Sequence, residues 1–114
     1  MSVPKEIEQH MPELQELCNR HHVRSLYLFG SAARGEMKPT SDYDFLIDIP
    51  LVQENFEAYA NSYFEMADSL ERMLNRKVDL LTVPMLSNPY LIQSIEKSKV
   101  QLYFSTRNDS NSIN

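Results

Sequence analysis

The chain has 114 residues, of which 42% are hydrophobic and 24% charged, and its formal net charge is −5 at pH 7. This length suits one folded domain, and the negative charge argues against direct nucleic-acid binding, which depends on clustered Lys and Arg. No apolar run approaches the roughly 20 residues that a membrane-spanning helix needs, and the N-terminus lacks the apolar stretch of a signal peptide. We therefore expect a cytoplasmic protein that contacts no membrane.

Four secondary-structure elements are predicted in the first half of the chain. They are a helix over 7–18, a strand over 24–29, a short helix over 31–34 and a strand over 43–49. The first helix follows from apolar residues spaced three and four apart, with Pro12 marking either a kink or the start of its regular part. Both strands are rich in β-forming residues, and they stop at Gly30 and Pro50 respectively.

The second half of the chain predicts the rest of a layered domain. Its elements are a long helix over 53–75, a strand over 77–83, a helix that begins at Asn88-Pro89 and a short strand over 100–104. This order predicts an α/β (α+β) fold in which helices flank a small mixed β-sheet. We expect one domain over 1–104 and a disordered polar tail over 105–114, because that tail has nothing to bury.

Two aspartates at the entry to the second strand are the most informative feature. Asp42 and Asp44 are one residue apart, so the alternation of side chains along a strand places both carboxylates on one face. Their Cα atoms are then about 7 Å apart, a spacing that suits hard divalent cations such as Mg²⁺. Two such ions about 3.5–4 Å apart could clamp the attacking and leaving oxygens of a phosphoryl transfer.

A candidate phosphate site lies just upstream, where the first strand ends. Gly30 and Ser31 stand at a strand-to-helix junction, where backbone N–H groups and a hydroxyl can meet a phosphate. Gly30 would let the phosphate approach the backbone closely. Arg34 follows one helical turn later and can pair with a phosphate or with an aspartate.

These residues together resemble a known family signature. The motifs that carry the resemblance are Gly30-Ser31, Arg34-Gly35 and Ser41-Asp42-x-Asp44. They are similar to the signature of the polymerase-β-type nucleotidyltransferase superfamily, in its minimal nucleotidyltransferase branch, and the similarity covers residues 26–49. The resemblance implies a polymerase-β-like core in which the Gly-Ser pair binds the triphosphate and the paired aspartates hold the metal ions.

A third carboxylate on a following strand completes the site in that family. Asp79 fits this role, because it is the acidic residue inside the third predicted strand, and it is the candidate general base. Arg34 and Ser41 are further candidates for nucleotide binding. The roles of Arg34, Gly35 and Asp48 stay open, since each can also be structural.

The resemblance also implies a partner. Minimal nucleotidyltransferases pair with small helical HEPN-type toxins in two-gene modules, in which the nucleotidyltransferase is the antitoxin and can modify a tyrosine of the toxin with AMP. We therefore predict Mg²⁺-dependent transfer of AMP from ATP to a hydroxyl of such a toxin. The alternatives are an antitoxin that acts by contact alone and, ranked lower, an enzyme acting on a small hydroxyl compound. Nucleotide preference and homo- or hetero-oligomeric state stay open.

Overall fold

The computed structural model describes residues 3–105, in which four strands form one mixed sheet. The strands are β1 (Ser25–Phe29), β2 (Tyr43–Asp48), β3 (Val78–Thr82) and β4 (Val100–Phe104), in the spatial order β3-β2-β1-β4. β1 is antiparallel to both of its neighbours, β2 and β4, whereas β2 and β3 are parallel. The predicted fold class, a small mixed sheet flanked by helices, is confirmed.

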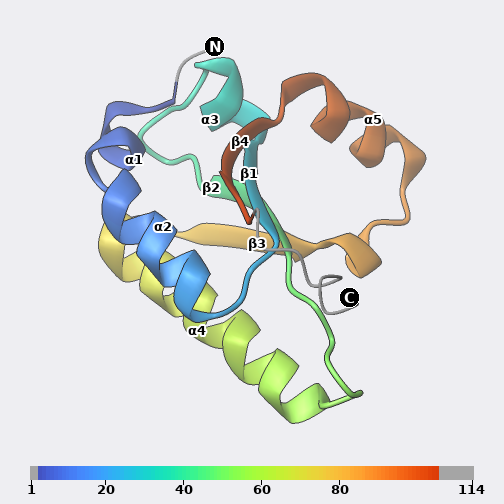
Figure 1. The fold of residues 1–114 in the computed structure, drawn as a ribbon. Coiled ribbons are helices and arrows are strands. Elements are labelled where there is room, and N and C mark those ends of the chain that lie inside the picture. Colours follow the sequence, from blue (N-terminus) through green and yellow to red (C-terminus); the bar gives the residue numbers. More distant parts are fainter. Residues whose placement is uncertain (1–2, 106–114) are drawn as a thin grey trace.

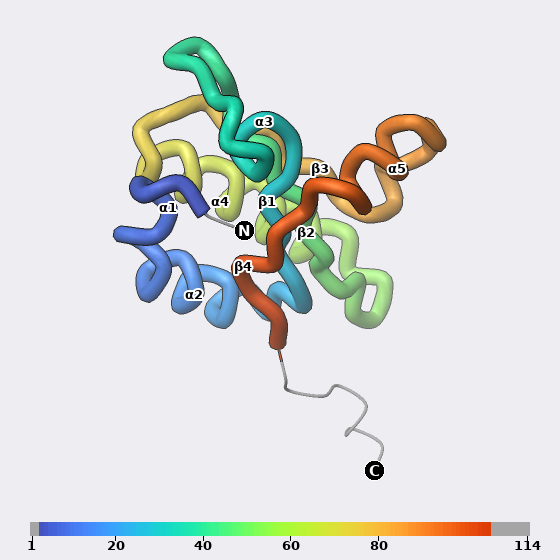
Figure 2. Tube along the Cα trace, turned by 90° about the horizontal axis from the view of Figure 1, so that it is seen from above, coloured from blue at the N-terminus to red at the C-terminus, as the bar shows by residue number. Residues whose placement is uncertain are grey.

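The helices cover both faces of this sheet. They are α1 (Lys5–Gln9), α2 (Met11–Arg20), α3 (Gly30–Arg34), α4 (Phe56–Leu74), the 3-10 helix η1 (Val83–Met85) and α5 (Pro89–Ser98). α1, α2 and α4 lie together on one side of the sheet, α5 lies on the other side, and α3 lies across the end of the sheet (Figure 1). In the view from above, α3 caps the end of β1 and α5 extends away beside it (Figure 2).

The structure differs from the predicted elements mainly at two breaks. The first predicted helix is divided at His10 into α1 and α2. Pro12 is the second residue of α2, a position whose N–H would make no hydrogen bond within the helix, so proline is tolerated there. Of the two interpretations of Pro12, the start of a regular helix is therefore confirmed. The unpredicted break is η1, which follows β3 directly.

The core explains why the aspartates face outward. Tyr43, Phe45 and Ile47 of β2 are buried in the main apolar cluster, together with Leu14 of α2 and Leu70 of α4. The intervening residues of β2 point to the opposite face of the sheet. There Leu46 packs with Phe29 and Ile95 in a smaller apolar cluster beneath α5. Alternation along β2 therefore holds as predicted.

The C-terminal prediction falls mostly outside these residues. Ser105 has no regular secondary structure, and residues 106–114, the rest of the predicted polar tail, lie outside the described range. Across residues 3–105, no helix has both the length and the apolar character required to cross a membrane.

Candidate active site

Strand register brings the three predicted aspartates to one place. Asp44 of β2 is the register partner of Asp79 in the parallel strand β3, so the two side chains lie on the same face about 4.8 Å apart at their backbones. Asp42 lies just before β2, two residues from Asp44. Asp42 and Asp79 are exposed and Asp44 is half-buried, which leaves the cluster open on its outer side.

The electrostatics of Asp44 reflect this crowding. Burial, together with the charges of Asp79 and Asp42, raises its pKa to about 6, while Arg34 acts in the opposite direction. Burial and the charge of Asp79 also raise the pKa of Tyr63, whose hydroxyl donates a hydrogen bond of 2.6 Å to the carbonyl of Leu80. Within residues 3–105, no group of three or more His, Cys, Asp or Glu side chains is placed so that it could hold a metal ion as it stands. The site is an open acidic patch.

Gly30 is tightly fitted against this patch. It has a positive φ of 74°, and a Cβ at this position would overlap Oδ2 of Asp44 and lie 3.2 Å from its Cγ. Any larger residue would therefore displace the carboxylate as well as strain the backbone. The close approach predicted at Gly30 exists, and its partner in the structure is the carboxylate of Asp44.

Ser98 is a residue of this site that sequence reasoning missed. The N–H of Gly30 donates to its Oγ at 3.3 Å, and its hydroxyl donates to the carbonyl of Ser94 at 3.0 Å. The expectation of free N–H groups at this junction is thus wrong for Gly30. Ser98 is buried near the end of α5, and no motif marks it, because a serine in a helix has many ordinary uses.

Arg34 and Ser41, two further predicted binding residues, have local partners. The Nε of Arg34 donates to Oε1 of Glu36 at 2.9 Å in a solvent-exposed ion pair. The hydroxyl of Ser41 accepts the N–H of Lys38 at 2.9 Å, so it closes the turn before Asp42. Ser31 is half-buried at the start of α3. Gly35 ends α3 with a φ of 73° and has open space around it.

Arg76 holds the segment that leads to Asp42, and it was also missed from the sequence. Its Nη1 donates to three backbone carbonyls, those of Lys38 at 3.3 Å, Pro39 at 3.1 Å and Ser41 at 2.9 Å. Its guanidinium also lies 5.4 Å from the ring centroid of Tyr43. Arg76 stands between α4 and β3, so it ties the start of β2 to the connection before Asp79.

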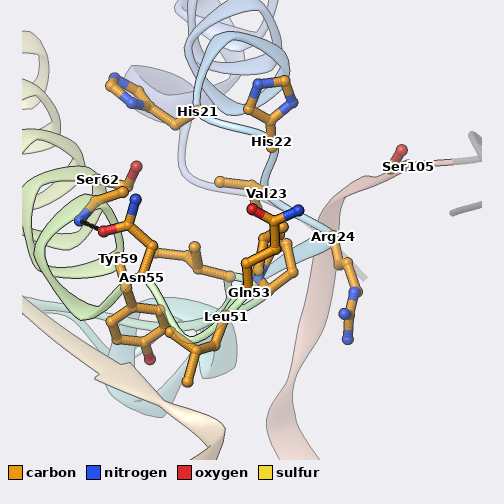
Figure 3. A pocket seen from close by; sticks show the side chains of 14 residues that line it. His21, His22, Val23, Arg24, Leu51, Gln53, Asn55, Tyr59, Ser62 and Ser105 are labelled. Carbon is orange, nitrogen blue, oxygen red and sulfur yellow. Dashed lines mark hydrogen bonds between the residues drawn. The ribbon is translucent and has the colours of Figure 1, made fainter.

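A cavity of about 610 Å³ lies at the end of the sheet away from the aspartate cluster (Figure 3). Its walls include His21 and His22 after α2, Leu51 after β2, and Asn55 and Tyr59 at the start of α4. None of the predicted site residues lines it. The aspartate cluster and this cavity are therefore separate features of the structure.

Known proteins share this arrangement of elements. A family model described as a nucleotidyltransferase domain matches residues 8–102, most of the chain. The chain belongs to this family. A protein of Methanocaldococcus jannaschii named "Putative protein adenylyltransferase MJ1379" is 34% identical to this nucleotidyltransferase over 98 residues, which cover 79% of this chain and 95% of that one.

Solved structures agree with this nucleotidyltransferase in fold. A crystal structure of a toxin-antitoxin with AMP-PNP aligns with a TM-score of 0.63 at 23% identity, covering 89% of this chain and 78% of that one. A tri-AMPylated HEPN toxin of Shewanella oneidensis in complex with MNT antitoxin gives a TM-score of 0.58 at 21% identity, covering 91% and 77%. The resemblance to minimal nucleotidyltransferases is thus confirmed.

The two glycines of the nucleotidyltransferase allow a matched test of the contact with Asp44. Gly30→Ala and Gly35→Ala both place a side chain at a positive φ, which costs about 1–2 kcal/mol. Only the Gly30 variant adds an overlap with the carboxylate, so urea unfolding should show a larger loss of stability for it. In an Asp44→Ala background this difference should shrink. Equal losses in the two glycine variants would contradict the contact.

Arg76→Lys should loosen the segment before Asp42 without removing a charge. Lysine is shorter and lacks the planar guanidinium that lies over Tyr43, so its ammonium cannot hold the same position beneath the three carbonyls. We therefore expect a stability loss of about 1–3 kcal/mol and faster amide hydrogen exchange in residues 38–42. The control is Arg72→Lys, in an exposed pair with Asp68 at 3.0 Å, which should change stability by less than about 0.5 kcal/mol. Unchanged exchange in Arg76→Lys would show that the arginine does not position this segment.

Stability should fall as pH rises through the titration of Asp44. Its pKa of about 6 in the folded state exceeds the usual value near 3.9 expected in the unfolded state. Between about pH 4 and pH 6 the folded state therefore binds more protons than the unfolded state, and its stability falls as pH rises. With EDTA and no nucleotide, Asp44→Asn should therefore melt at a higher temperature than wild type at pH 7.5, with a smaller difference at pH 5. Asp68→Asn, in the exposed pair on α4, should show no such pH-dependent gain.

Proposed function

We propose that this chain is the antitoxin of a toxin–antitoxin pair and transfers AMP from ATP to a hydroxyl of a HEPN-type partner in the cytoplasm. The observation that carries the proposal is the parallel register of Asp44 and Asp79, which places a third carboxylate beside the Asp42-x-Asp44 pair. Gly30 packs on Asp44, and Ser31 follows it in the chain. Acidic and phosphate-binding groups thus adjoin one another, as nucleotidyl transfer requires.

The donor atoms of the cluster are of the type that Mg²⁺ prefers, because they are carboxylate oxygens. Burial and then the charges of Asp79 and Asp42 raise the pKa of Asp44, and a bound cation would relieve this repulsion between the carboxylates. Mg²⁺ commonly keeps several waters and binds one or two carboxylates plus substrate phosphates, so an open patch suits it better than a closed cage. Asp42, Asp44 and Asp79 would hold two ions.

The reaction requires the acceptor hydroxyl to be placed in line with the α-phosphorus. Bound Mg²⁺ would supply neutralisation of the triphosphate charge and of the departing pyrophosphate. The acceptor oxygen forms a bond to the α-phosphorus, and the bond from that phosphorus to the bridging oxygen breaks. Asp79, the exposed carboxylate of β3, accepts the hydroxyl proton. Ser31 and Arg34 hold the phosphates.

The choice of a protein acceptor rests on the relatives. The M. jannaschii relative is named as a protein adenylyltransferase, and solved structures of the same fold are complexes with HEPN toxins. The chain also exposes apolar side chains that a protein partner could cover, such as Phe56 and Phe64 on α4. We propose a tyrosine of the partner as the acceptor.

The test is transfer of label from ATP. The purified chain is incubated with α-labelled ATP, Mg²⁺ and the product of the neighbouring gene, and label is sought on that protein. We expect labelling that Asp44→Asn lowers more than about 100-fold, the order of effect of losing one electrostatic contact to the reacting group. Asp48→Asn is the matched control, because Asp48 has the same parity on β2 but pairs with Arg24 at 3.8 Å.

The outcomes separate the alternatives. Neutralisation of the partner without any label, retained in an Asp42→Asn, Asp44→Asn double variant, would show an antitoxin that acts by contact alone. Transfer to a small hydroxyl compound in the absence of any protein partner would favour the small-molecule enzyme. Label on the partner that is lost when one tyrosine is changed to Phe would support the proposed reaction.

A further inference from the structure

A hollow of about 320 Å³ lies between α3 and α5, beside the aspartate cluster. Six residues line it, namely Arg34, Tyr90, Gln93, Ser94, Lys97 and Ser98. It joins the active site at two points. Ser98 accepts the N–H of Gly30, and Arg34 is close enough to influence the pKa of Asp44. A molecule whose phosphates contact Gly30 and Ser31 could therefore continue into this hollow.

The lining has the chemistry of a nucleotide. It contains two cations, an amide, two serine hydroxyls and the phenol ring of Tyr90, and no carboxylate, although the chain as a whole is acidic. Tyr90 is 82% exposed, and among residues 3–105 neither its ring nor the ammonium group of Lys97 has a side-chain partner. An exposed ring of this kind can stack on a base, because every base has a π-face.

The spacing along α5 also suits a nucleotide. Positions 90, 93, 94 and 97 follow one another at helical spacing, so they form one stripe along the side of α5 that borders the hollow. Tyr90 and Lys97 are about 10 Å apart along the axis. Lys97 lies toward Gly30, since the next residue is Ser98, and Tyr90 lies at the far end. Charge thus sits near the phosphate end and the ring sits away from it.

We propose that this hollow is the nucleoside subsite of the enzyme, with Tyr90 stacking on the base, Gln93 at its edge, and Lys97 with Arg34 on the phosphates. The inference rests on the proposed function and extends it to residues outside the family motif. Arg34 must exchange Glu36 for phosphate, and the exposed pair that it leaves is of the kind that contributes little to stability. Gln93 can both donate and accept hydrogen bonds, as a base edge requires.

The test measures binding without the partner protein, so it is independent of AMP transfer. Calorimetric titration with MgATP should show affinity reduced about fivefold or more in Tyr90→Ala and nearly unchanged in Tyr90→Phe, which keeps the ring. Magnesium tripolyphosphate, which has no base, should bind Tyr90→Ala and wild type equally. Lys97→Ala should bind both ligands more weakly.

Matched controls exclude general effects of the substitutions. Phe104→Ala removes another exposed ring, 57% accessible on β4, and Lys5→Ala removes an exposed cation on α1; both should bind MgATP like wild type. Lys97 lies in the last turn of α5, where a cation also favours the helix dipole, so thermal melting of Lys97→Ala reports that contribution separately.

Three results would overturn the inference. Tyr90→Ala could bind MgATP as well as Phe104→Ala does, or it could lose MgATP and tripolyphosphate equally, which would exclude base stacking. It could also keep its MgATP affinity while binding the partner more weakly, which would make Tyr90 a protein contact. Failure of AMP transfer with intact, Tyr90-dependent MgATP binding would instead overturn the proposed function and leave the subsite in place.

Discussion

The parallel pairing of β2 with β3 is the constraint on which the candidate site depends. It places Asp44 opposite Asp79, so two carboxylates share one face of the sheet at the spacing of neighbouring strands. The repulsion between these charges is unfavourable for folding. Apolar packing on the opposite face of the sheet offsets this unfavourable contribution. There Tyr43 and Phe45, which flank Asp44, are buried in the main core. The same strand thus supplies the apolar anchor and the acidic cluster.

Two polar contacts hold the backbone around this cluster. Arg76 binds the carbonyls of the turn before Asp42, and Ser98 binds the N–H of Gly30 on the other side of Asp44. Both come from segments that follow β2 in the chain, so the site is complete only when α4, β3 and α5 have packed. A residue that supports the site in this way need not touch the substrate.

The sequence predicts the parts of the site that depend on local rules. Alternation along one strand predicts that Asp42 and Asp44 face the same side, and the strand end predicts the special backbone at Gly30. The place of Asp79 depends on register between strands that are distant in the sequence, which the family resemblance supplied and periodicity alone did not. Arg76 and Ser98 could not be predicted, because hydrogen bonds to backbone groups leave no pattern of residue types.

In the proposed nucleoside subsite, α5 connects the aspartate cluster to the nucleotide base. Ile95 anchors the helix in the cluster with Phe29 and Leu46, so the helix is fixed directly to β1 and β2. The neighbouring stripe of α5 then presents Lys97 and Tyr90 at positions set by the helical rise. Because Phe29 also precedes Gly30, a change in how Ile95 packs would shift the phosphate and base ends of the hollow together. A rigid helix of this kind would fix the distance between Tyr90 and the aspartate cluster, which must match the length of the bound nucleotide.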